Sequence, residues 1–289
     1  MSRIAGLVSD APASLALRAV GGLLDRVGRH GDVTAALSLP GGTLGWTGAG
    51  PRGLARRGPL ALALDGTLYD RAAHNRPELD DAALLLELVE RHGLAGALAR
   101  VNGDFAVALW DADERTLWLA RDRVGIRPLY WARTSDGIAF ASRPLALAAL
   151  DGVGLDPDPR FLAVFAGSHY RLFDNAPERS PFARVAQVPA ATVVRLHDGQ
   201  AVATRYWTPA GEDDVREDDA TLARAYRELL LDAVAIRVRA AERPAFTLSG
   251  GMDSSSVLGC AVESVGRRQH AFSTVYEDAT YDESAEIVS

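Results

Sequence analysis

Apolar and polar positions form three paired blocks in the middle of the chain. The blocks are residues 105–122, 128–143 and 192–207, and each consists of two apolar runs around a short polar turn. The runs are rich in β-branched and aromatic residues, which is typical of β-hairpins. A Pro-rich irregular region, residues 156–189, precedes the third block. The first two thirds of the chain therefore predict several antiparallel hairpins.

Two further strands are predicted before these hairpins. Residues 3–8 are a short apolar run, and residues 59–64 alternate leucine and alanine after a proline. A continuous apolar run bounded by turn residues is typical of a buried strand. We predict that the second strand ends in a tight turn at Asp65-Gly66.

Two helices are predicted in the same part of the chain. Apolar residues recur at helical spacing over residues 14–30, and Gly31 follows them. A leucine-rich run at helical spacing also follows Asp80 and Asp81, and it ends at Gly93. Aspartate is a favoured N-cap and glycine a favoured C-terminal stop, so both ends of this second helix are predicted.

The pattern changes near residue 210. The acidic stretch at residues 212–219 predicts a solvated linker that places negative charge at a helix N-terminus. After it come a helical run, a strand, a second helix and a second strand, at residues 221–240, 245–248, 254–265 and 270–275. This alternation is typical of a parallel α/β sheet. We therefore predict one domain over residues 1–210 and an incomplete second domain over residues 211–289.

Composition excludes several classes of protein. The chain has 289 residues, of which 48% are hydrophobic and 24% charged, as in an ordinary globular protein. Its net charge is −7 and it has no basic block, which argues against a nucleic-acid surface. It has no apolar run long enough for a membrane span and no signal peptide, so we expect a cytoplasmic protein without a membrane partner. The single cysteine, Cys260, excludes a disulfide framework.

Residues 246–255 contain the segment that carries chemistry. A strand leads through Ser249, Gly250 and Gly251 directly into a helix that carries Ser254 and Ser255. Backbone N–H groups and hydroxyls at a helix N-terminus form a site suited to phosphate. The alternative is a tight strand-to-helix turn with Ser254 as the N-cap. A nucleophilic serine is less favoured, because no histidine motif and no G-x-S-x-G elbow accompanies it.

Asp253 lies beside this predicted phosphate site. A bare carboxylate there would repel phosphate unless a cation lay between them, so the sequence predicts Mg²⁺ bound by Asp253 and phosphate oxygens. The segment has no lysine after its glycines and is therefore not a P-loop of the GxxxxGK[ST] type.

Two groups of motifs resemble the asparagine synthetase superfamily. Residues 248–255, Leu-Ser-Gly-Gly-Met-Asp-Ser-Ser, match its pyrophosphate loop, and residues 272–275 with Asp282-Glu283 resemble its next strand and loop. Residues 101–111 and 120–130 resemble the paired motifs of its glutaminase-type domain. The two groups occur in the family's order and cover nearly the whole chain.

The resemblance implies a fold and a reaction. The fold is an α+β, four-layered αββα sandwich of the Ntn-hydrolase type, followed by the start of an α/β parallel-sheet, Rossmann-like ATP-pyrophosphatase domain. The reaction is the activation of a carboxylate by ATP and Mg²⁺ as an acyl-adenylate, which an amine then attacks. The nucleotide-binding residues that it implies are Leu248, Ser249, Gly250, Gly251, Asp253, Ser254, Ser255, Ser273 and Thr274.

Three departures from the family pattern indicate an inactive glutaminase site. Ser2 follows Met1 where glutamine-using members have a cysteine, and a hydroxyl is a weaker nucleophile than a thiol. Asp65-Gly66 stands in place of the family's Asn-Gly, and residues 43–64 lack a recognisable arginine clamp for the substrate. Cys260 lies among apolar helix positions and is predicted to be a core residue.

Four charged residues near the second family motif have a simpler interpretation. Arg121, Asp122, Arg123 and Arg127 follow a predicted strand, and we expect them to form a salt-bridged structural set. A role in binding substrate is the alternative.

The family members that have lost glutaminase activity suggest the substrate. They include β-lactam synthetases and lasso-peptide cyclases, in which the attacking amine already belongs to the substrate. We favour a lasso-peptide macrolactam synthetase, with β-lactam synthetase, glutamine-dependent asparagine synthetase and a non-catalytic pseudoenzyme or interaction subunit as alternatives. The resemblance places the catalytic residues of the second domain beyond Ser289. We therefore expect the chain alone to be inactive, either as a fragment or as one of two polypeptides that complete the domain.

Overall fold

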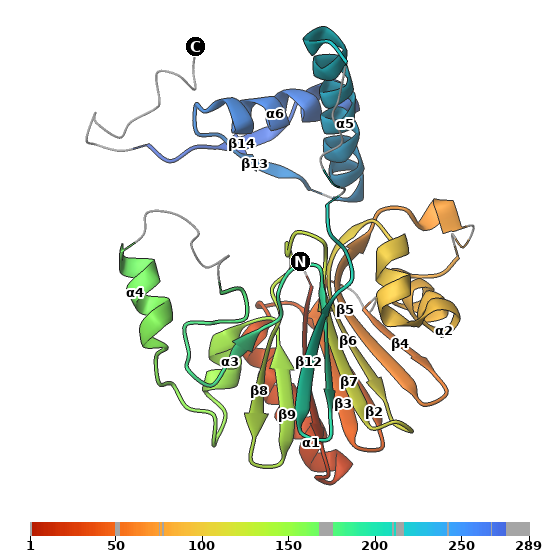
Figure 1. Cartoon of the computed structure of the whole chain (residues 1–289), viewed down its shortest axis with the longest axis vertical. Coiled ribbons are helices and arrows are strands. Elements are labelled where there is room, and N and C mark those ends of the chain that lie inside the picture. The colour runs from red at the N-terminus through yellow and green to blue at the C-terminus, as the bar shows by residue number, and fades with distance from the viewer. Residues whose placement is uncertain are drawn as a thin grey trace. The chain divides into compact units, whose positions relative to one another are not determined.

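The structure is a computed structural model in which the chain divides into two compact units. The first spans Met1–Pro209 and the second Ala210–Ser289 (Figure 1). Each unit is described by itself. The described residues are 2–49, 53–74, 76, 78–167, 176–209, 211, 217–241, 243–266 and 268–275.

The first unit contains two six-stranded antiparallel sheets. Sheet A has, in spatial order, β10 (Ala186–Gln187), β8 (Tyr130–Thr134), β9 (Gly137–Ala141), β1 (Arg3–Ser9), β3 (Gly42–Gly48) and β2 (Val33–Leu39). Sheet B has β12 (Gln200–Arg205), β11 (Thr192–His197), β7 (Thr116–Arg121), β6 (Gly103–Asp111), β5 (Leu60–Leu68) and β4 (Leu54–Arg57). The three predicted hairpins are confirmed as β6–β7, β8–β9 and β11–β12.

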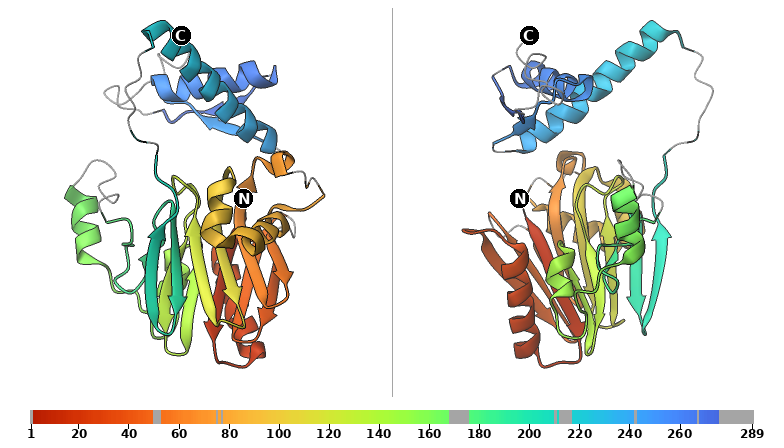
Figure 2. Two further views of the ribbon diagram at one scale, coloured as in Figure 1. Left: turned by 45° about the vertical axis from the view of Figure 1, so that its right-hand side comes forward. Right: turned by 90° about the vertical axis from the view of Figure 1, so that its left-hand side faces the viewer.

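Helices flank the two sheets on both sides (Figure 2). The helices α1 (Ala13–Val27) and α3 (Pro144–Ala148) pack on sheet A, and α2 (Asp81–Arg100) packs on sheet B. Three apolar clusters therefore separate four layers: one under α1 and α3, one between the sheets, and one under α2. The αββα sandwich that the resemblance implies is confirmed. A short helix, α4 (Pro159–Gly167), and a 3₁₀ turn, η1 (Arg71–His74), complete the unit.

Strand alternation explains why sheet B can serve two cores. On β5, Leu62 and Leu64 belong to the cluster under α2, whereas Ala61 and Ala63 belong to the cluster between the sheets. Successive side chains of a strand point to opposite faces, so one strand covers both cores when each position is apolar. The neighbouring strand β6 repeats the pattern, with Trp110 on the inter-sheet side.

The predicted turn at Asp65-Gly66 is wrong. The strand β5 continues to Leu68, and its pairing with β6 is unbroken through both residues. Gly66 has a φ of 139°, and a Cβ there would lie 2.0 Å from the carbonyl oxygen of Asp104. The glycine therefore allows the two strands to approach each other and does not reverse the chain.

Other differences have equally local causes. The helix after Asp80 is confirmed, with the Asp80 carboxylate accepting from the backbone N–H of Ala83 at 2.8 Å. Gly93 breaks it with a φ of 66°, but a second helical segment follows at once to Arg100. The strands β2, β3 and β4 were not predicted, because β3 reads as a glycine-rich loop. A Cβ on Gly45 would lie 2.6 Å from Val20 of α1, so the glycine is needed for the helix to pack on the strand.

The second unit consists of α5 (Asp219–Ala240), β13 (Ala245–Thr247), α6 (Met252–Val265) and β14 (His270–Phe272). The two strands are parallel, as the alternation predicts. A small core of Val234, Val238 and Ala261 joins the helices, and Cys260 packs against it. The described residues contain no helix that is long and apolar enough to cross a membrane.

Candidate functional site

The glycine loop of the second unit connects β13 to α6. Gly250 has a φ of 68°, in the left-handed region where glycine is favoured. Gly251 is the N-cap of α6, and no side chain caps the helix. The first N–H groups of an uncapped helix are available to an anion, and the helix dipole favours negative charge at this end.

The serines of the loop bond to one another. The Ser254 hydroxyl donates to the carbonyl oxygen of Gly251 at 3.1 Å and accepts from the backbone N–H of Ser249 at 3.2 Å. The two hydroxyls of Ser249 and Ser254 are also 3.2 Å apart. The alternative in which Ser254 is the N-cap is wrong, because Ser254 lies inside the first helical turn and reaches back across the loop. Its hydrogen bonds hold the loop in a compact shape.

Ser273 and Thr274 follow β14, the strand next to β13. The backbone N–H of Leu248 donates to the carbonyl oxygen of Phe272 at 3.0 Å, so the two strand ends are in register. The carboxyl ends of parallel strands lie on one edge of a sheet, where α/β proteins bind nucleotides. The structure therefore places Ser273 and Thr274 on the edge that also carries the glycine loop. Asp282 and Glu283 lie outside the described residues.

Asp253 lies in the first turn of α6 and is exposed. Among the described residues, no group of three or more His, Cys, Asp or Glu side chains could hold a metal ion. Asp253 fits Mg²⁺ as a single carboxylate ligand, because Mg²⁺ in nucleotide sites takes most of its oxygens from phosphate and water.

A second polar cluster occurs in the first unit, around the buried carboxylate of Asp65. The Ser2 hydroxyl donates to Asp65 Oδ1 at 3.0 Å and accepts from the backbone N–H of Gly66 at 3.1 Å. The Ser142 hydroxyl lies 3.1 Å from Asp65 Oδ2 and accepts from the backbone N–H of Ile4 at 2.9 Å. Asp65 is only 2% exposed, so it joins β1, β5 and the end of β9 inside the protein.

Burial dominates the electrostatics of this cluster. It raises the pKa of Asp65, although the positive charge of Arg127 and the hydroxyls of Ser2 and Ser142 oppose the rise. The Arg127 Nη1 atom is 3.8 Å from Asp65 Oδ1. Burial, with the repulsion of neighbouring arginines, also lowers the pKa of Arg3. The desolvated carboxyl group therefore binds a proton more readily than an ordinary aspartate.

The four charged residues near β7 form a structural set as predicted, but among the described residues their ion pair joins Arg127 to Asp65 and not two members of the set. Arg121 donates to the carbonyl oxygens of Arg127 at 2.6 Å, Val188 at 2.8 Å and also Gly125. The Asp122 carboxylate accepts from the backbone N–H groups of Val124, Ile126 and Arg127 in the same turn and from that of Phe105 on β6. The Arg123 guanidinium donates to the carbonyl oxygens of Ala99 and Val101 at the end of α2. Backbone groups take the place of ion pairs at Arg121 and Asp122 because these two side chains are buried, and buried polar groups need partners.

The Ser2–Asp65 arrangement uses both the proton and a lone pair of the Ser2 hydroxyl in hydrogen bonds. Acyl transfer requires free hydrogen-bond donors where negative charge develops on the carbonyl oxygen. Here the backbone N–H of Gly66 donates to Ser2, and the nearest side chain is a carboxyl group that repels an oxyanion when ionised. Ser142 was missed by the sequence reasoning, and its only signal was a place at the end of the second predicted hairpin.

Replacing Asp65 by asparagine is expected to change how stability depends on pH. A raised pKa means that the native state binds the proton more tightly than the unfolded state, so the stabilisation is complete below the ordinary aspartate pKa and is lost as pH rises through the raised value. The variant has no such titration. The free energy of unfolding of the natural protein, relative to Asp65→Asn, should therefore fall as pH rises above about 4, the ordinary aspartate pKa.

Urea unfolding of both proteins at each pH measures this difference, and the other titrating groups cancel in the comparison. Ser2→Ala is a suitable companion, since it removes one donor to Asp65 and should raise the pKa of Asp65 further. If the free energy of unfolding of the natural protein rose with pH relative to that of Asp65→Asn, the assignment would be contradicted.

Family models match both units of the chain. A model described as a glutamine amidotransferase domain matches residues 57–207, about half of the chain, and gives the class of the first unit. A model described as asparagine synthase matches residues 225–288. With these two domains in this order, the chain belongs to the asparagine synthetase family.

Curated relatives show the same family at low identity. The chain is 34% identical over 219 residues to a carboxyethyl-arginine β-lactam synthase of Streptomyces clavuligerus. The matched residues are 72% of this chain and 38% of the relative. It is 28% identical over 195 residues to a glutamine-hydrolysing asparagine synthetase of Bacillus subtilis, covering 64% of this chain and 30% of the relative. The chain thus spans about a third of the length of these relatives. Among solved structures, a glutamine phosphoribosylpyrophosphate amidotransferase from B. subtilis is similar with 16% identity and a TM-score of 0.49, over 100% of this chain and 70% of that chain.

Proposed function

We propose that the protein is an ATP-dependent, AMP-forming amide synthetase. It activates a carboxylate as an acyl-adenylate, which an amine of the substrate then attacks. The match of residues 225–288 to the asparagine synthase model supports the use of ATP. The uncapped N-terminus of α6 and the left-handed Gly250 support a phosphate site in the same segment.

The proposed roles of the loop follow from its geometry. The backbone N–H groups after Gly250 would donate to the departing pyrophosphate, and the hydroxyls of Ser249, Ser254 and Ser255 would add donors. Leu248 and Gly251 place the backbone, while Ser273 and Thr274 would bind from the neighbouring strand end. Mg²⁺, when bound at Asp253, supplies positive charge that offsets the charge of the phosphates.

The Ser2–Asp65 hydrogen bond is the observation that favours an amine already present on the substrate. A thiol nucleophile is absent at residue 2, and the residue that Ser2 contacts is a buried carboxyl group, Asp65, where the family motif has an asparagine that could donate. We therefore propose that the first unit does not release ammonia from glutamine. Its role would be to support the second unit.

We propose that the reaction closes a ring by joining two ends of one substrate, as in lasso-peptide macrolactam formation. Holding both ends together supplies an effective concentration that can be equivalent to ~7 to 11 kcal/mol of the barrier. β-Lactam formation is the second candidate, and the carboxyethyl-arginine β-lactam synthase relative favours it.

Additional structure is proposed to cover the second unit in the active enzyme. Phe272 on β14 is 66% exposed, although both faces of a parallel α/β sheet are normally covered; Leu229 on α5 and Val275 after β14 are also exposed, at 71% and 66%. More of the same polypeptide, or a second polypeptide, would supply the cover. Mass spectrometry of the purified protein would distinguish these two sources.

The full-length protein should convert a lasso core peptide in the presence of ATP and Mg²⁺. We expect release of AMP and the loss of one water from the peptide mass, with no glutamate formed from glutamine. Carboxyethyl-arginine in place of the peptide tests the second candidate by the same two readouts. Glutamate release would contradict the loss of glutaminase activity. If neither substrate led to AMP formation and the peptide mass stayed unchanged, the pseudoenzyme alternative would be favoured.

A further inference from the structure

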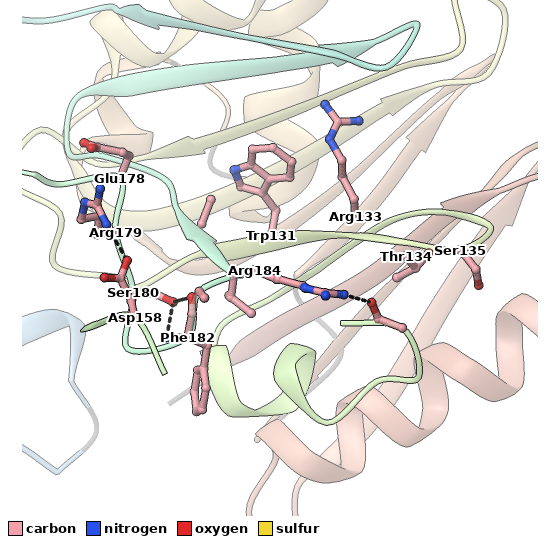
Figure 3. Close-up of a pocket in the computed structure, with 14 residues that line it drawn as sticks. Trp131, Arg133, Thr134, Ser135, Asp158, Glu178, Arg179, Ser180, Phe182 and Arg184 are labelled. Atoms are coloured by element: carbon pink, nitrogen blue, oxygen red, sulfur yellow. Dashed lines mark hydrogen bonds and ion pairs between the residues drawn. The ribbon is translucent and has the colours of Figure 1, made fainter. Parts of the chain in front are cut away.

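A cavity of about 710 Å³ lies at one edge of sheet A, beside β8 (Figure 3). One wall is β8 and the turn after it, and the other is the segment 178–186, which leads into β10. The residues that matter below are Trp131, Arg133, Glu178, Phe182 and Arg184. We call this cavity the β8 groove. Neither the nucleotide loop nor the Ser2–Asp65 cluster contributes to it.

The groove contains a free stretch of sheet edge. The strand β10 has two residues, and it pairs with β8 only at Tyr130 and Trp131. In the β8–β9 hairpin, Thr134 pairs with Gly137 across a two-residue turn, so this closing pair exchanges both hydrogen bonds. Alternate residues then turn their backbone groups to the other edge. Arg133 is such a residue, and no strand among the described residues pairs with it there.

The groove also carries positive charge without a carboxylate partner. The guanidinium of Arg133 donates to the carbonyl oxygen of Gly199 at 2.5 Å, and that of Arg184 donates to the carbonyl oxygen of Gly152 at 3.1 Å. Within the described part of the chain, neither guanidinium takes part in an ion pair. Arg179, in contrast, is paired with Asp158 at 2.6 Å, as the dashed line in Figure 3 shows.

Apolar surface accompanies these charges. Trp131 lies on the same face of β8 as Arg133, whose guanidinium is 5.8 Å from the Trp131 ring centre. Phe182 lines the opposite wall, and both aromatic side chains are only half-buried. Glu178 is the one acid of the lining outside the Arg179–Asp158 pair, so two arginines face one free carboxylate in a chain with a net charge of −7.

We infer that the β8 groove binds an extended acidic peptide, which adds to sheet A as an antiparallel strand beside Arg133 and continues the line of β10. Backbone groups of Arg133 would pair with the peptide, and its acidic side chains would bind the Arg133 guanidinium beside Trp131, while Arg184 adds positive charge to the opposite wall. Its apolar side chains, on the face of the peptide turned away from Trp131 and Arg133, would contact Phe182. Strand addition of this kind takes affinity from the backbone and specificity from alternate side chains. The inference does not rest on the proposed function.

The test uses the full-length protein and a fluorescein-labelled heptapeptide in which valine and glutamate alternate, with blocked ends. We expect saturable binding by fluorescence anisotropy. A peptide with lysine in place of glutamate should bind at least tenfold more weakly, and so should the acidic peptide with its central amides N-methylated, because methylation removes strand hydrogen bonds. Hydrogen exchange of the Arg133 amide should slow when the acidic peptide is bound.

Variants of the protein locate the site. The double variant Arg133→Glu, Arg184→Glu should weaken binding of the acidic peptide at least tenfold and improve binding of the lysine peptide. Arg18→Glu, which changes an exposed arginine of α1 outside the groove, is the matched control and should bind as the natural protein does. The peptide changes leave the protein untouched, so they remain informative if the double variant does not fold.

Three results would overturn the inference. The first is equal binding of the N-methylated and unmodified acidic peptides, which would exclude strand addition. The second is a failure of the acidic peptide to bind, or binding of that peptide that is unchanged in the double variant Arg133→Glu, Arg184→Glu. The third is concentration-dependent dimerisation that the double variant abolishes, because a second copy of the chain would then occupy the edge.

Discussion

Asp253→Asn is expected to lower ATP–pyrophosphate exchange by the full-length protein by ~10² to 10³-fold, as loss of one preorganised charge interaction in an active site does. The substitution keeps the shape of the side chain and removes its charge. Asp253 is exposed in the first turn of α6, so the fold should not change. Without the carboxylate, Mg²⁺ would lose its proposed protein ligand at the phosphate site.

Glu263→Gln is the matched control for this experiment. Glu263 lies on the same helix and forms an exposed ion pair with Arg227 at 2.7 Å, far along the chain from the glycine loop. Exposed pairs contribute little to stability, so exchange should be unchanged in this variant. Normal exchange by Asp253→Asn would remove Asp253 from the nucleotide site, whereas equal losses in both variants would indicate damage to the helix.

Trp110→Ala is expected to lower the free energy of unfolding of the first unit by ~3 to 5 kcal/mol, the range measured for large aromatic deletions in cores. Trp110 is 1% exposed in the cluster between the two sheets. Its Nε1 atom donates to the carbonyl oxygen of Pro40 at 3.1 Å, and the ring packs against Gly42, where a Cβ would lie 2.6 Å away. Gly42 has no side chain that could fill the space that alanine would leave.

Chemical unfolding followed by near-ultraviolet circular dichroism measures this loss. Trp110→Phe is the companion variant, since it keeps much of the ring volume and loses one hydrogen bond, which is worth about 1 kcal/mol. A Trp110→Ala variant as stable as the natural protein would contradict the packing of the two sheets against each other.

The hairpins could be predicted because their pattern is local. Each of β6–β7, β8–β9 and β11–β12 has two alternating runs around a short polar turn, and the structure keeps all three. The strand β3 could not be predicted, because its glycines contact Trp110 and Val20, which are distant in sequence. The error at Asp65-Gly66 has the same origin. A glycine that lets two strands approach has the same sequence signal as a glycine in a turn.

The two candidate sites differ in how far the sequence could define them. The glycine loop is contiguous, and hydrogen bonds between Ser249 and Ser254 span only five positions. The Asp65 cluster joins residues 63 and 77 positions apart, through Ser2 and Ser142. Sequence reasoning identified Ser2 and Asp65 separately, by resemblance to a family motif. The contact between Ser2 and Asp65, and that between Ser142 and Asp65, depend on the packing of β1 and β9 of sheet A against β5 of sheet B.

The central position of β1 constrains the order in which the first unit can fold. This strand lies between β3 and β9, and Ala5 pairs with Ala141 on one side. A chain that emerges from the ribosome must therefore keep one edge of its first strand unsatisfied until residues 137–141 have been synthesised. Such distant pairing slows folding and lengthens the time for which an open strand edge is exposed. Chaperone dependence during synthesis is the expected physiological consequence.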